Sequence, residues 1–222
     1  MEFGNCKTVI FDLDGTIVDT EPLQQLAFNR LLAKNGIDYC ISEEEYGRVF
    51  VGVSVQENAE WLIRRFCMPN TPDEIRAAHD MLYARLIADQ QNLAAMPGLM
   101  TLLAHLQARD IACGVATGSP RAHAEMVLRG LKIDSHFRAV VTGSDISKPK
   151  PDPEIYLRAL QALEVEPNEA IALEDSAAGI AAAKAAGLYA IAVPNRYTAQ
   201  QDMSHADVWV ENLWQVGKIL IG

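Results

Sequence analysis

Two carboxylates follow the first apolar segment of the chain. Residues 8–11 are followed by Asp12 and Asp14, and then by the turn residues Gly15 and Thr16. Aspartate and glycine can simply form a turn, but an open parallel sheet binds its ligands beyond the carboxyl ends of its strands. An aspartate there can act as a nucleophile and form a covalent intermediate. A second carboxyl nearby can transfer the proton that such a reaction requires.

Three further apolar segments end in polar side chains. Thr117 follows one, Lys148 lies a few residues beyond the next, and Glu174 and Asp175 close the last. Because strand ends on one side of a parallel sheet are neighbours, we expect these groups to meet Asp12 in one crevice. Clustered carboxylates repel one another unless a cation neutralises them. Their oxygen atoms suit Mg²⁺, which is the cofactor we expect.

Together these groups indicate phosphoryl transfer. Asp12 can attack phosphorus, and Asp14 can protonate the leaving oxygen and then activate water. The metal and Lys148 would offset charge on the phosphoryl oxygens, while Thr117 and the backbone at Gly118 would donate hydrogen bonds. The sequence therefore predicts an acyl-phosphate mechanism.

Several of these residues allow a structural interpretation. Lys150 precedes proline as Lys148 does, so both lysines are expected in an extended backbone, and residue spacing does not choose between them. Thr117 could belong only to a helix cap in which Ser119 is the capping residue. Glu174 could cap the helix that follows it, where a carboxylate interacts favourably with the helix dipole.

Strands and helices alternate after Gly98, which is typical of a parallel sheet. Ser119-Pro120 and Asp152-Pro153 each pair a capping residue with a proline at the first helical position, and Gly187 is expected to form a left-handed helix cap. We expect strands at 8–12, 111–116, 139–142, 170–173 and 189–193. Two of the expected helices end near Arg109 and Ala186, and two others begin at Pro120 and Pro153. Residues 207–222 are expected to form one more short strand and a helix.

A helical module fills the gap between the first two strands. Residues Ala59, Leu62 and Phe66 recur at helical spacing, and a second such pattern follows them. The predicted fold class is α/β, with a three-layer Rossmann-like parallel sheet and an inserted small α-helical cap. We expect the core at 1–18 plus 96–222 and the cap at 19–95, with candidate hinges after Asp14 and at the Met96-Pro97-Gly98 breaker.

Composition narrows the class of protein further. Half of the 222 residues are hydrophobic, which is enough for a sizeable core. The formal charge of -10 argues against nucleic acid as a partner, and no apolar segment is long enough to span a bilayer. We expect a cytoplasmic monomer without membrane partners. We also expect the cysteines to be small buried apolar residues rather than a zinc site or disulfides, because they form no C-x-x-C pair: Cys6, Cys40, Cys67 and Cys113.

The four motifs, 12–16, Thr117, 147–152 and 173–176, closely resemble the signatures of the haloacid dehalogenase superfamily, in its branch of small phosphatases and phosphomutases. This resemblance implies that Asp12 is the nucleophile and Asp14 the general acid and base. It selects Lys148 over Lys150. It implies that the Asp12 side chain, the Asp14 carbonyl and Asp175 hold Mg²⁺, with Glu174 as a further ligand or a support. We assign substrate binding to Gly15, Thr16, Gly118 and Ser119.

The cap distinguishes branches of that superfamily. Members that cleave phosphonates use a cap lysine, but no lysine lies between Lys34 and Lys132. The β-phosphoglucomutase branch uses a cap lysine, an arginine after a Gly-Val-Ser turn and a histidine in the first cap helix. Here Val55 follows that turn, and Gln24 stands about where the histidine would be. Dehalogenases need neither Mg²⁺ nor the second aspartate, so the presence of Asp14 and of Glu174-Asp175 disfavours that branch.

These departures favour hydrolysis. We expect a Mg²⁺-dependent phosphatase that acts on a small phosphorylated metabolite, such as a sugar or polyol phosphate, through an aspartyl-phosphate. One alternative is a β-phosphoglucomutase-like phosphomutase. Another is a phospho-accepting receiver module, which also clusters aspartates, threonine, lysine and Mg²⁺ on a parallel sheet, but such modules are much shorter and have no inserted cap.

Overall fold

A parallel sheet forms the centre of the larger unit of the protein. The computed structural model describes residues 6–221. Within them, six strands pair in the order β3-β2-β1-β4-β5-β6, and every pair is parallel. The strands are β1 (Thr8–Phe11), β2 (Ala112–Ala116), β3 (Phe137–Val141), β4 (Ala170–Glu174), β5 (Tyr189–Ala192) and β6 (Val208–Trp209).

The two central strands are buried on both faces. All residues of β1 and β4 are buried, which explains why apolar residues run without alternation over 9–11 and 170–173. Their register pairs Phe11 with Leu173, and the backbone N–H of Asp12 donates to the Leu173 carbonyl at 2.9 Å. The sheet hydrogen bonding therefore fixes the backbone of Asp12 at the carboxyl end of the sheet.

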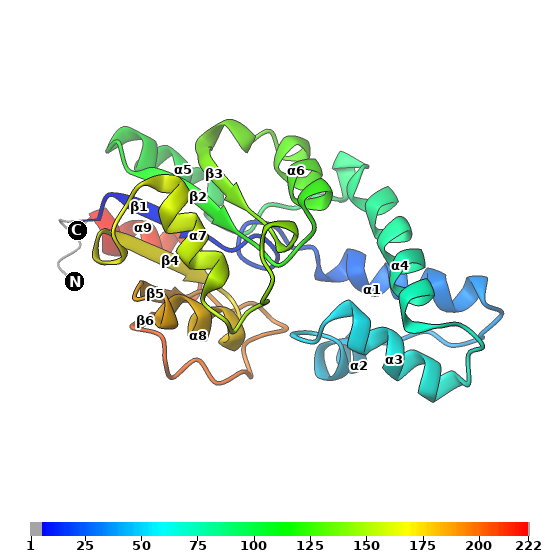
Figure 1. The fold of residues 1–222 in the computed structure, drawn as a ribbon. Helices are drawn as coiled ribbons and strands as arrows, with labels where there is room; N and C mark the ends of the chain where they lie inside the picture. The colour runs from blue at the N-terminus through cyan, green and yellow to red at the C-terminus, as the bar shows by residue number, and fades with distance from the viewer. Residues whose placement is uncertain (1–5, 222) are drawn as a thin grey trace. The chain divides into compact units, whose positions relative to one another are not determined.

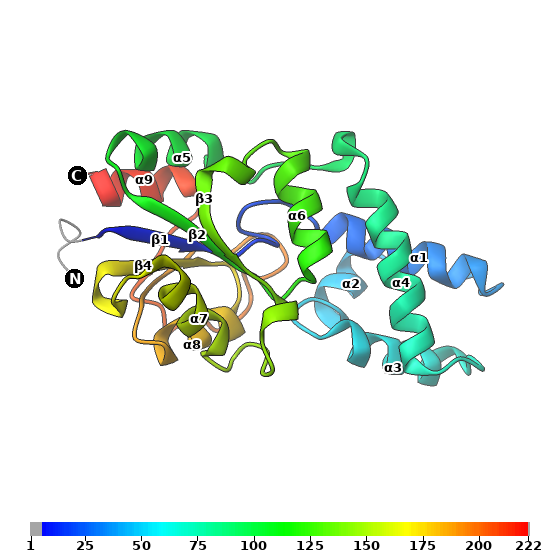
Figure 2. The same cartoon turned by 45° about the horizontal axis from the view of Figure 1, so that its top comes forward.

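Helices cover both faces of this sheet and give the predicted three layers (Figures 1 and 2). Helices α5 and α9 pack together on one face, and α7 and α8 pack on the other. The bounds of the helices in this unit are α5 (Leu99–Ala108), α6 (Arg121–Gly130), α7 (Glu154–Leu163), α8 (Ala177–Ala185) and α9 (Leu213–Ile221).

Two helix starts differ from the prediction. Helices α6 and α7 begin one residue later than expected, because Pro120 and Pro153 occupy the N-cap position instead of the first helical position. The side chain of Ser119 therefore caps no helix. The predicted cap at Gly187 is confirmed, since this residue has a φ of 83° just after α8.

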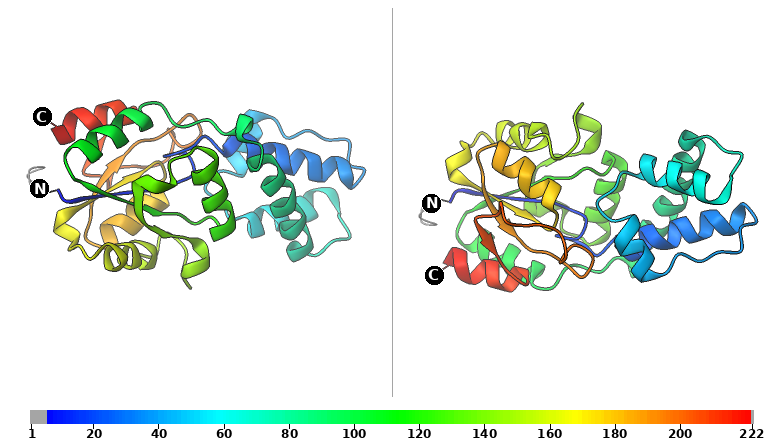
Figure 3. Two further views of the ribbon diagram at one scale, coloured as in Figure 1. Left: turned by 90° about the horizontal axis from the view of Figure 1, so that it is seen from above. Right: turned by 90° about the horizontal axis from the view of Figure 1, so that it is seen from below.

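A second compact unit spans Thr20–Asn92 and is entirely helical in its regular structure. Its helix α4 packs against both α1 and α3 (Figure 3). Capping boxes start α3 at Ser54 and α4 at Thr71, which satisfies backbone N–H groups that helix starts leave free. The bounds of its helices are α1 (Glu21–Lys34), α2 (Glu43–Val49), α3 (Val55–Phe66) and α4 (Pro72–Ile87).

The two segments that lead into and out of the helical unit are hydrogen-bonded to each other. Asp19 N donates to the Ala94 carbonyl and Met96 N donates to the Ile17 carbonyl, both at 2.9 Å. The larger unit therefore includes residues up to Asp19 and from Leu93 onward, whereas the sequence placed the boundaries at 18/19 and 95/96. The proposed hinge positions stay predictions.

The cysteine prediction is wrong for two residues. Cys6 and Cys113 are buried as expected, but Cys40 and Cys67 are exposed. Cys67 follows α3 in a left-handed conformation, with a φ of 49°, and Cys40 lies in the loop after α1. All four are free thiols. Among residues 6–221, no helix combines the length and apolarity that crossing a membrane requires.

Candidate active site

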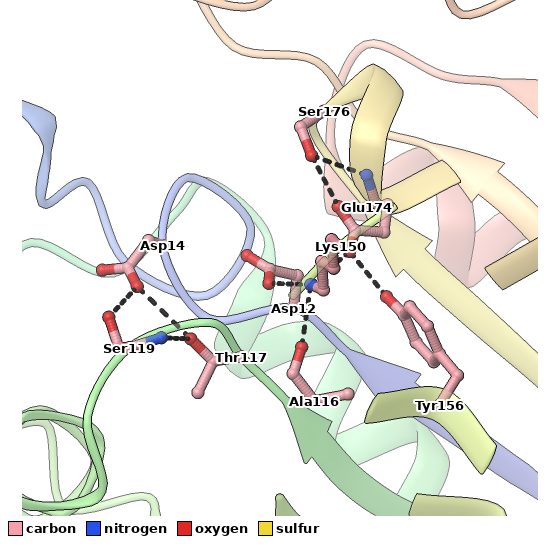
Figure 4. Close-up of polar contacts among 10 residues, drawn as sticks. Asp12, Asp14, Ala116, Thr117, Ser119, Lys150, Tyr156, Glu174 and Ser176 are labelled. Carbon is pink, nitrogen blue, oxygen red and sulfur yellow. Dashed lines mark hydrogen bonds and ion pairs between the residues drawn. The ribbon is translucent and has the colours of Figure 1, made fainter. Parts of the chain in front are cut away.

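Lys150 lies at the centre of the polar groups at the strand ends (Figure 4). Its Nζ donates to Asp12 Oδ1 at 2.5 Å, to Glu174 Oε1 at 2.6 Å and to the Ala116 carbonyl at 3.0 Å. A lysine ammonium has three donors, so each donor has an acceptor. These acceptors lie at the ends of β1, β4 and β2, which are neighbours in the sheet.

Glu174 is fully buried, and donors from the surrounding loops and helices contact its carboxylate. Its Oε1 accepts the Tyr156 hydroxyl at 2.6 Å in addition to Lys150, and its Oε2 accepts Ser176 Oγ at 3.2 Å. A Cβ on Gly179 would lie 1.9 Å from Oε2, so the first turn of α8 packs directly on the carboxylate. A buried carboxylate needs such hydrogen-bond partners. Held by them, Glu174 in turn accepts a hydrogen bond from the Lys150 ammonium and fixes its position.

The charges of this cluster depend on one another. Burial raises the pKa of Asp12 to about 8, the Lys150 ammonium opposes this shift, and the carboxylates of Glu174 and Asp14 increase it. Burial lowers the pKa of Lys150, but Asp12 and Glu174 outweigh burial and hold that pKa above its ordinary value. Lys150 is therefore a permanent cation. A second cation beside Asp12 would lower the pKa of that carboxyl and favour its nucleophilic, ionised form.

Asp14 is held by the loop that follows β2. Its Oδ2 accepts Ser119 Oγ at 2.6 Å and Thr117 Oγ1 at 3.4 Å (Figure 4). The backbone N–H of Ser119 in turn donates to Thr117 Oγ1 at 3.0 Å. Gly15 begins the turn after Asp14 and has a φ of 82°, a conformation that favours glycine. The structure thus brings Thr117 and Ser119 to Asp14, as contacts that fix its carboxylate.

The remaining predicted substrate contacts differ in exposure. Thr16 is buried, and its Oγ1 has no hydrogen-bond partner among the described residues. At Gly118 an added Cβ would meet no atom within 4 Å, so there is free space on that side of the residue. Substrate binding by Gly15, Thr16, Gly118 and Ser119 stays a prediction.

The predicted placement of Lys148 is wrong. Its ammonium faces Asp152 Oδ2 at 3.7 Å and its side chain is 71% exposed, whereas the Lys150 side chain is 12% exposed. The backbone N–H groups of Ser147 and Lys148 both donate to Glu154 Oε2 at 2.9 Å, and the chain bends there and turns again from Lys150. The loop is therefore not uniformly extended, and only Lys150 points to Asp12.

Two side chains at the site were missed by the sequence analysis. Tyr156 lies in the first turn of α7 and reaches Glu174. The Tyr156 contact brings the start of α7 close to the end of β4. Lys150 lies closer to this helix start than Lys148 does, which makes Lys150 the better candidate for the lysine that contacts Asp12 and Glu174. Asn195 follows β5 and donates to Asp175 Oδ2 at 2.8 Å. The rule that selected the other strand ends would have found it.

Three carboxylates could hold a metal ion. Ligand atoms of Asp12, Glu174 and Asp175 all lie within 4.8 Å of one another, and all three residues are buried. This set of hard oxygen donors, with Lys150 as the ammonium in contact with Asp12 and Glu174, fits a divalent cation such as Mg²⁺. Both oxygens of Glu174 already accept hydrogen bonds, so Asp12 and Asp175 are the better ligand candidates.

Comparison with known proteins agrees with this fold. Residues 9–193 match the model of the haloacid dehalogenase-like hydrolase family. The chain is 35% identical to validoxylamine A 7'-phosphate phosphatase of Streptomyces hygroscopicus subsp. limoneus, over 95% of each chain. It is 33% identical to β-phosphoglucomutase of Bacillus subtilis, over 84% of this chain and 83% of the relative.

A solved structure gives the same result. A mutant of the protein CbbY of Rhodobacter sphaeroides, crystallised in complex with xylulose-(1,5)bisphosphate, superposes with a TM-score of 0.84 and is 30% identical, over 96% of both chains. The chain belongs to the haloacid dehalogenase-like hydrolase family. It is an enzyme with the Rossmann-like core and inserted cap of that family.

Proposed function

We propose that this hydrolase is a Mg²⁺-dependent phosphatase of small phosphorylated metabolites, with sugar or polyol phosphates as the substrate class. The observation that carries the proposal is the position of Asp12. It lies buried at the carboxyl end of the central strand, between the ammonium of Lys150 and the carboxylate cluster with Asp175. That arrangement suits a carboxylate nucleophile whose substrate carries concentrated negative charge.

The residues divide the reaction between them. A carboxylate oxygen of Asp12 forms a bond to phosphorus while the bond from phosphorus to the leaving oxygen breaks, and Asp14 gives its proton to that oxygen. Asp14 then removes a proton from water, which attacks phosphorus and releases phosphate and free Asp12. Lys150 offsets charge on the phosphoryl oxygens. Asp12 and Asp175 would hold Mg²⁺, which supplies further neutralisation of these oxygens when bound; the Asp14 carbonyl is the third proposed ligand.

The relatives support the substrate class. The phosphatase from Streptomyces is named for a phosphorylated, sugar-like substrate, and the CbbY structure holds a ketopentose bisphosphate. The similarity to β-phosphoglucomutase favours a second candidate, a phosphomutase. The absence of lysine between Lys34 and Lys132 counts against it, because the mutase branch uses a cap lysine.

A metabolite screen tests the proposal. Phosphate release from a panel of sugar, polyol and other small phosphate esters is measured with Mg²⁺ and with EDTA. We expect catalytic turnover of several sugar or polyol phosphates, and we expect EDTA to abolish it. The variant Asp12→Asn should show no turnover while its circular dichroism spectrum stays unchanged. Turnover by folded Asp12→Asn would exclude an aspartyl-phosphate. A parallel assay of hexose 1-phosphate isomerisation, primed with hexose bisphosphate, tests the mutase, and stoichiometric labelling without turnover would indicate a receiver.

We also propose that the enzyme acts as a monomer. Static light scattering tests this directly. Phosphorylated metabolites are charged and are retained where they are made, which supports action in the cytoplasm; cell fractionation tests that location.

A further inference from the structure

Asn195 connects the loops that follow three neighbouring strands. It lies just beyond β5, and its Nδ2 donates to Asp175 Oδ2, after β4, at 2.8 Å. The same nitrogen lies 3.4 Å from the carbonyl oxygen of Gly15, in the loop after β1. One side-chain amide therefore contacts both the acidic cluster and the turn that carries Asp14.

The orientation of this amide is fixed by its own loop. Asn195 Oδ1 accepts the backbone N–H of Tyr197 at 2.9 Å, and the Asn195 N–H donates to Thr198 Oγ1 at 3.0 Å. Because the amide oxygen is occupied by Tyr197, the NH₂ group is the end that faces Asp175. The reverse orientation would place an oxygen beside the carboxylate and lose both contacts.

Space around Asp175 is also restricted. A Cβ on Gly15 would lie 2.3 Å from Asp175 Oδ2 and 2.6 Å from Asn195 Nδ2. Asp175 itself is 5% exposed. The Asp175 carboxylate is thus enclosed by Gly15 on one side and hydrogen-bonded to the Asn195 amide. One of its oxygen atoms also lies within 4.8 Å of possible metal-ligand atoms of Asp12 and Glu174.

We propose that Asn195 is a positioning residue for the metal site. Its amide holds Asp175 and the Gly15 turn in the arrangement that accepts Mg²⁺, so that little reorganisation is needed when the ion binds. This inference rests on the Mg²⁺-dependent function proposed above. Hydrogen-bond partners of metal ligands typically contribute about 10-fold to 100-fold to metal affinity.

The test is direct Mg²⁺ binding, measured by calorimetry on the substrate-free enzyme. Asn195→Ser keeps a hydroxyl that can accept from Tyr197 N–H but cannot span to Asp175. Thr198→Val is the matched control, because it removes the other side-chain bond of this loop and leaves the amide contact to Asp175. We expect the dissociation constant to rise about 10-fold in Asn195→Ser and to be essentially unchanged in Thr198→Val.

Activity gives a second readout. The Mg²⁺ concentration for half-maximal rate should rise by the same factor in Asn195→Ser, with the rate at saturating Mg²⁺ largely retained. Wild-type affinity in Asn195→Ser, or equal losses in both variants, would overturn the inference. If Asn195→Ser unfolds at too low a temperature for titration, Asn195→Thr replaces it, because threonine has the same hydroxyl on a stiffer side chain. The same rise in the Mg²⁺ dissociation constant is expected for Asn195→Thr. A wild-type enzyme that binds no Mg²⁺ would instead contradict the proposed function.

Discussion

Lys150 and Glu174 form a buried ion pair, with 2.6 Å between Nζ and Oε1. Glu174 is completely buried, and it shares Lys150 with Asp12. Removing one partner of a buried pair leaves an uncompensated charge, which typically costs about 3–5 kcal/mol. The pair therefore links the stability of the sheet ends to the electrostatics of Asp12, the proposed nucleophile.

Substitution of the two lysines should have opposite outcomes. Lys150→Met should lower kcat by about 100-fold or more, because the phosphoryl oxygens lose a preorganised cation. Lys148→Met, which removes an exposed ammonium 3.7 Å from Asp152, should leave kcat close to wild type. Phosphate release by both variants under saturating Mg²⁺ measures this difference. The reverse ranking would show that Lys148, the lysine selected by family resemblance, is the functional one.

Tyr156→Phe should destabilise the protein without removing the ion pair. The change deletes the hydroxyl that donates to Glu174 at 2.6 Å, and loss of a hydrogen bond to a buried charged group costs about 1.5–3 kcal/mol. Urea unfolding measures the free energy of unfolding. Tyr197→Phe is the control, since its hydroxyl accepts an exposed contact from Arg196 and should change stability by less than ~0.5 kcal/mol. Equal effects would argue against a special role of the buried phenol.

Ser119→Ala should lower kcat more than it changes KM. The hydroxyl of Ser119 holds Asp14, the proposed general acid and base, through a 2.6 Å hydrogen bond. Proton transfer by a positioned side chain contributes about 100-fold or more to the rate, and part of this contribution is lost when that side chain is loosely held. We expect a loss of about 10-fold in kcat, with recovery in Ser119→Thr because the hydroxyl returns. Ser144→Ala is the control on a neighbouring loop, where Ser144 Oγ accepts the Arg121 N–H. A KM effect alone would indicate substrate binding instead.

Glu154 should make the stability of the lysine loop depend on pH. Hydrogen bonds from Ser147, Arg158 and Lys148 lower its pKa from 4.5 to about 2. Because the folded-state pKa is the lower one, this stabilisation is complete above pH 4.5 and is lost as the pH falls toward 2. The melting temperature of Glu154→Gln should therefore lie below that of wild type at pH 7 and approach it in acid. A difference independent of pH would assign the effect to shape rather than charge.

The strand ends were predictable because their signal is local. Asp12 and Thr117 each follow an apolar segment directly and Asp175 follows one after a single residue, so the sequence alone placed them at one edge of a parallel sheet. The order of the strands was not predictable in this way. Pairing of β1 with both β2 and β4 joins segments about a hundred or more residues apart, and no local pattern specifies such contacts.

Loops limited the prediction of the site. The Pro-rich segment of Lys148 and Lys150 was expected to be extended because proline restricts the preceding residue. The carboxylate of Glu154 instead accepts hydrogen bonds from two backbone N–H groups of the loop, a contact between residues six or seven apart, and Lys150 is the lysine that reaches Asp12. The exposed Cys40 and Cys67 were missed for a similar reason, since composition does not report which loop faces solvent.

The paired segments around Val18 and Ala95 make the helical unit interchangeable in principle. Its two ends leave the sheet-containing unit at one place, so a module of different length or fold could be inserted there without stretching the chain. Asp12, Lys150 and Asp175 all lie outside the inserted stretch. A change in the inserted module would therefore leave the carboxylates and the lysine of the candidate site in their own unit.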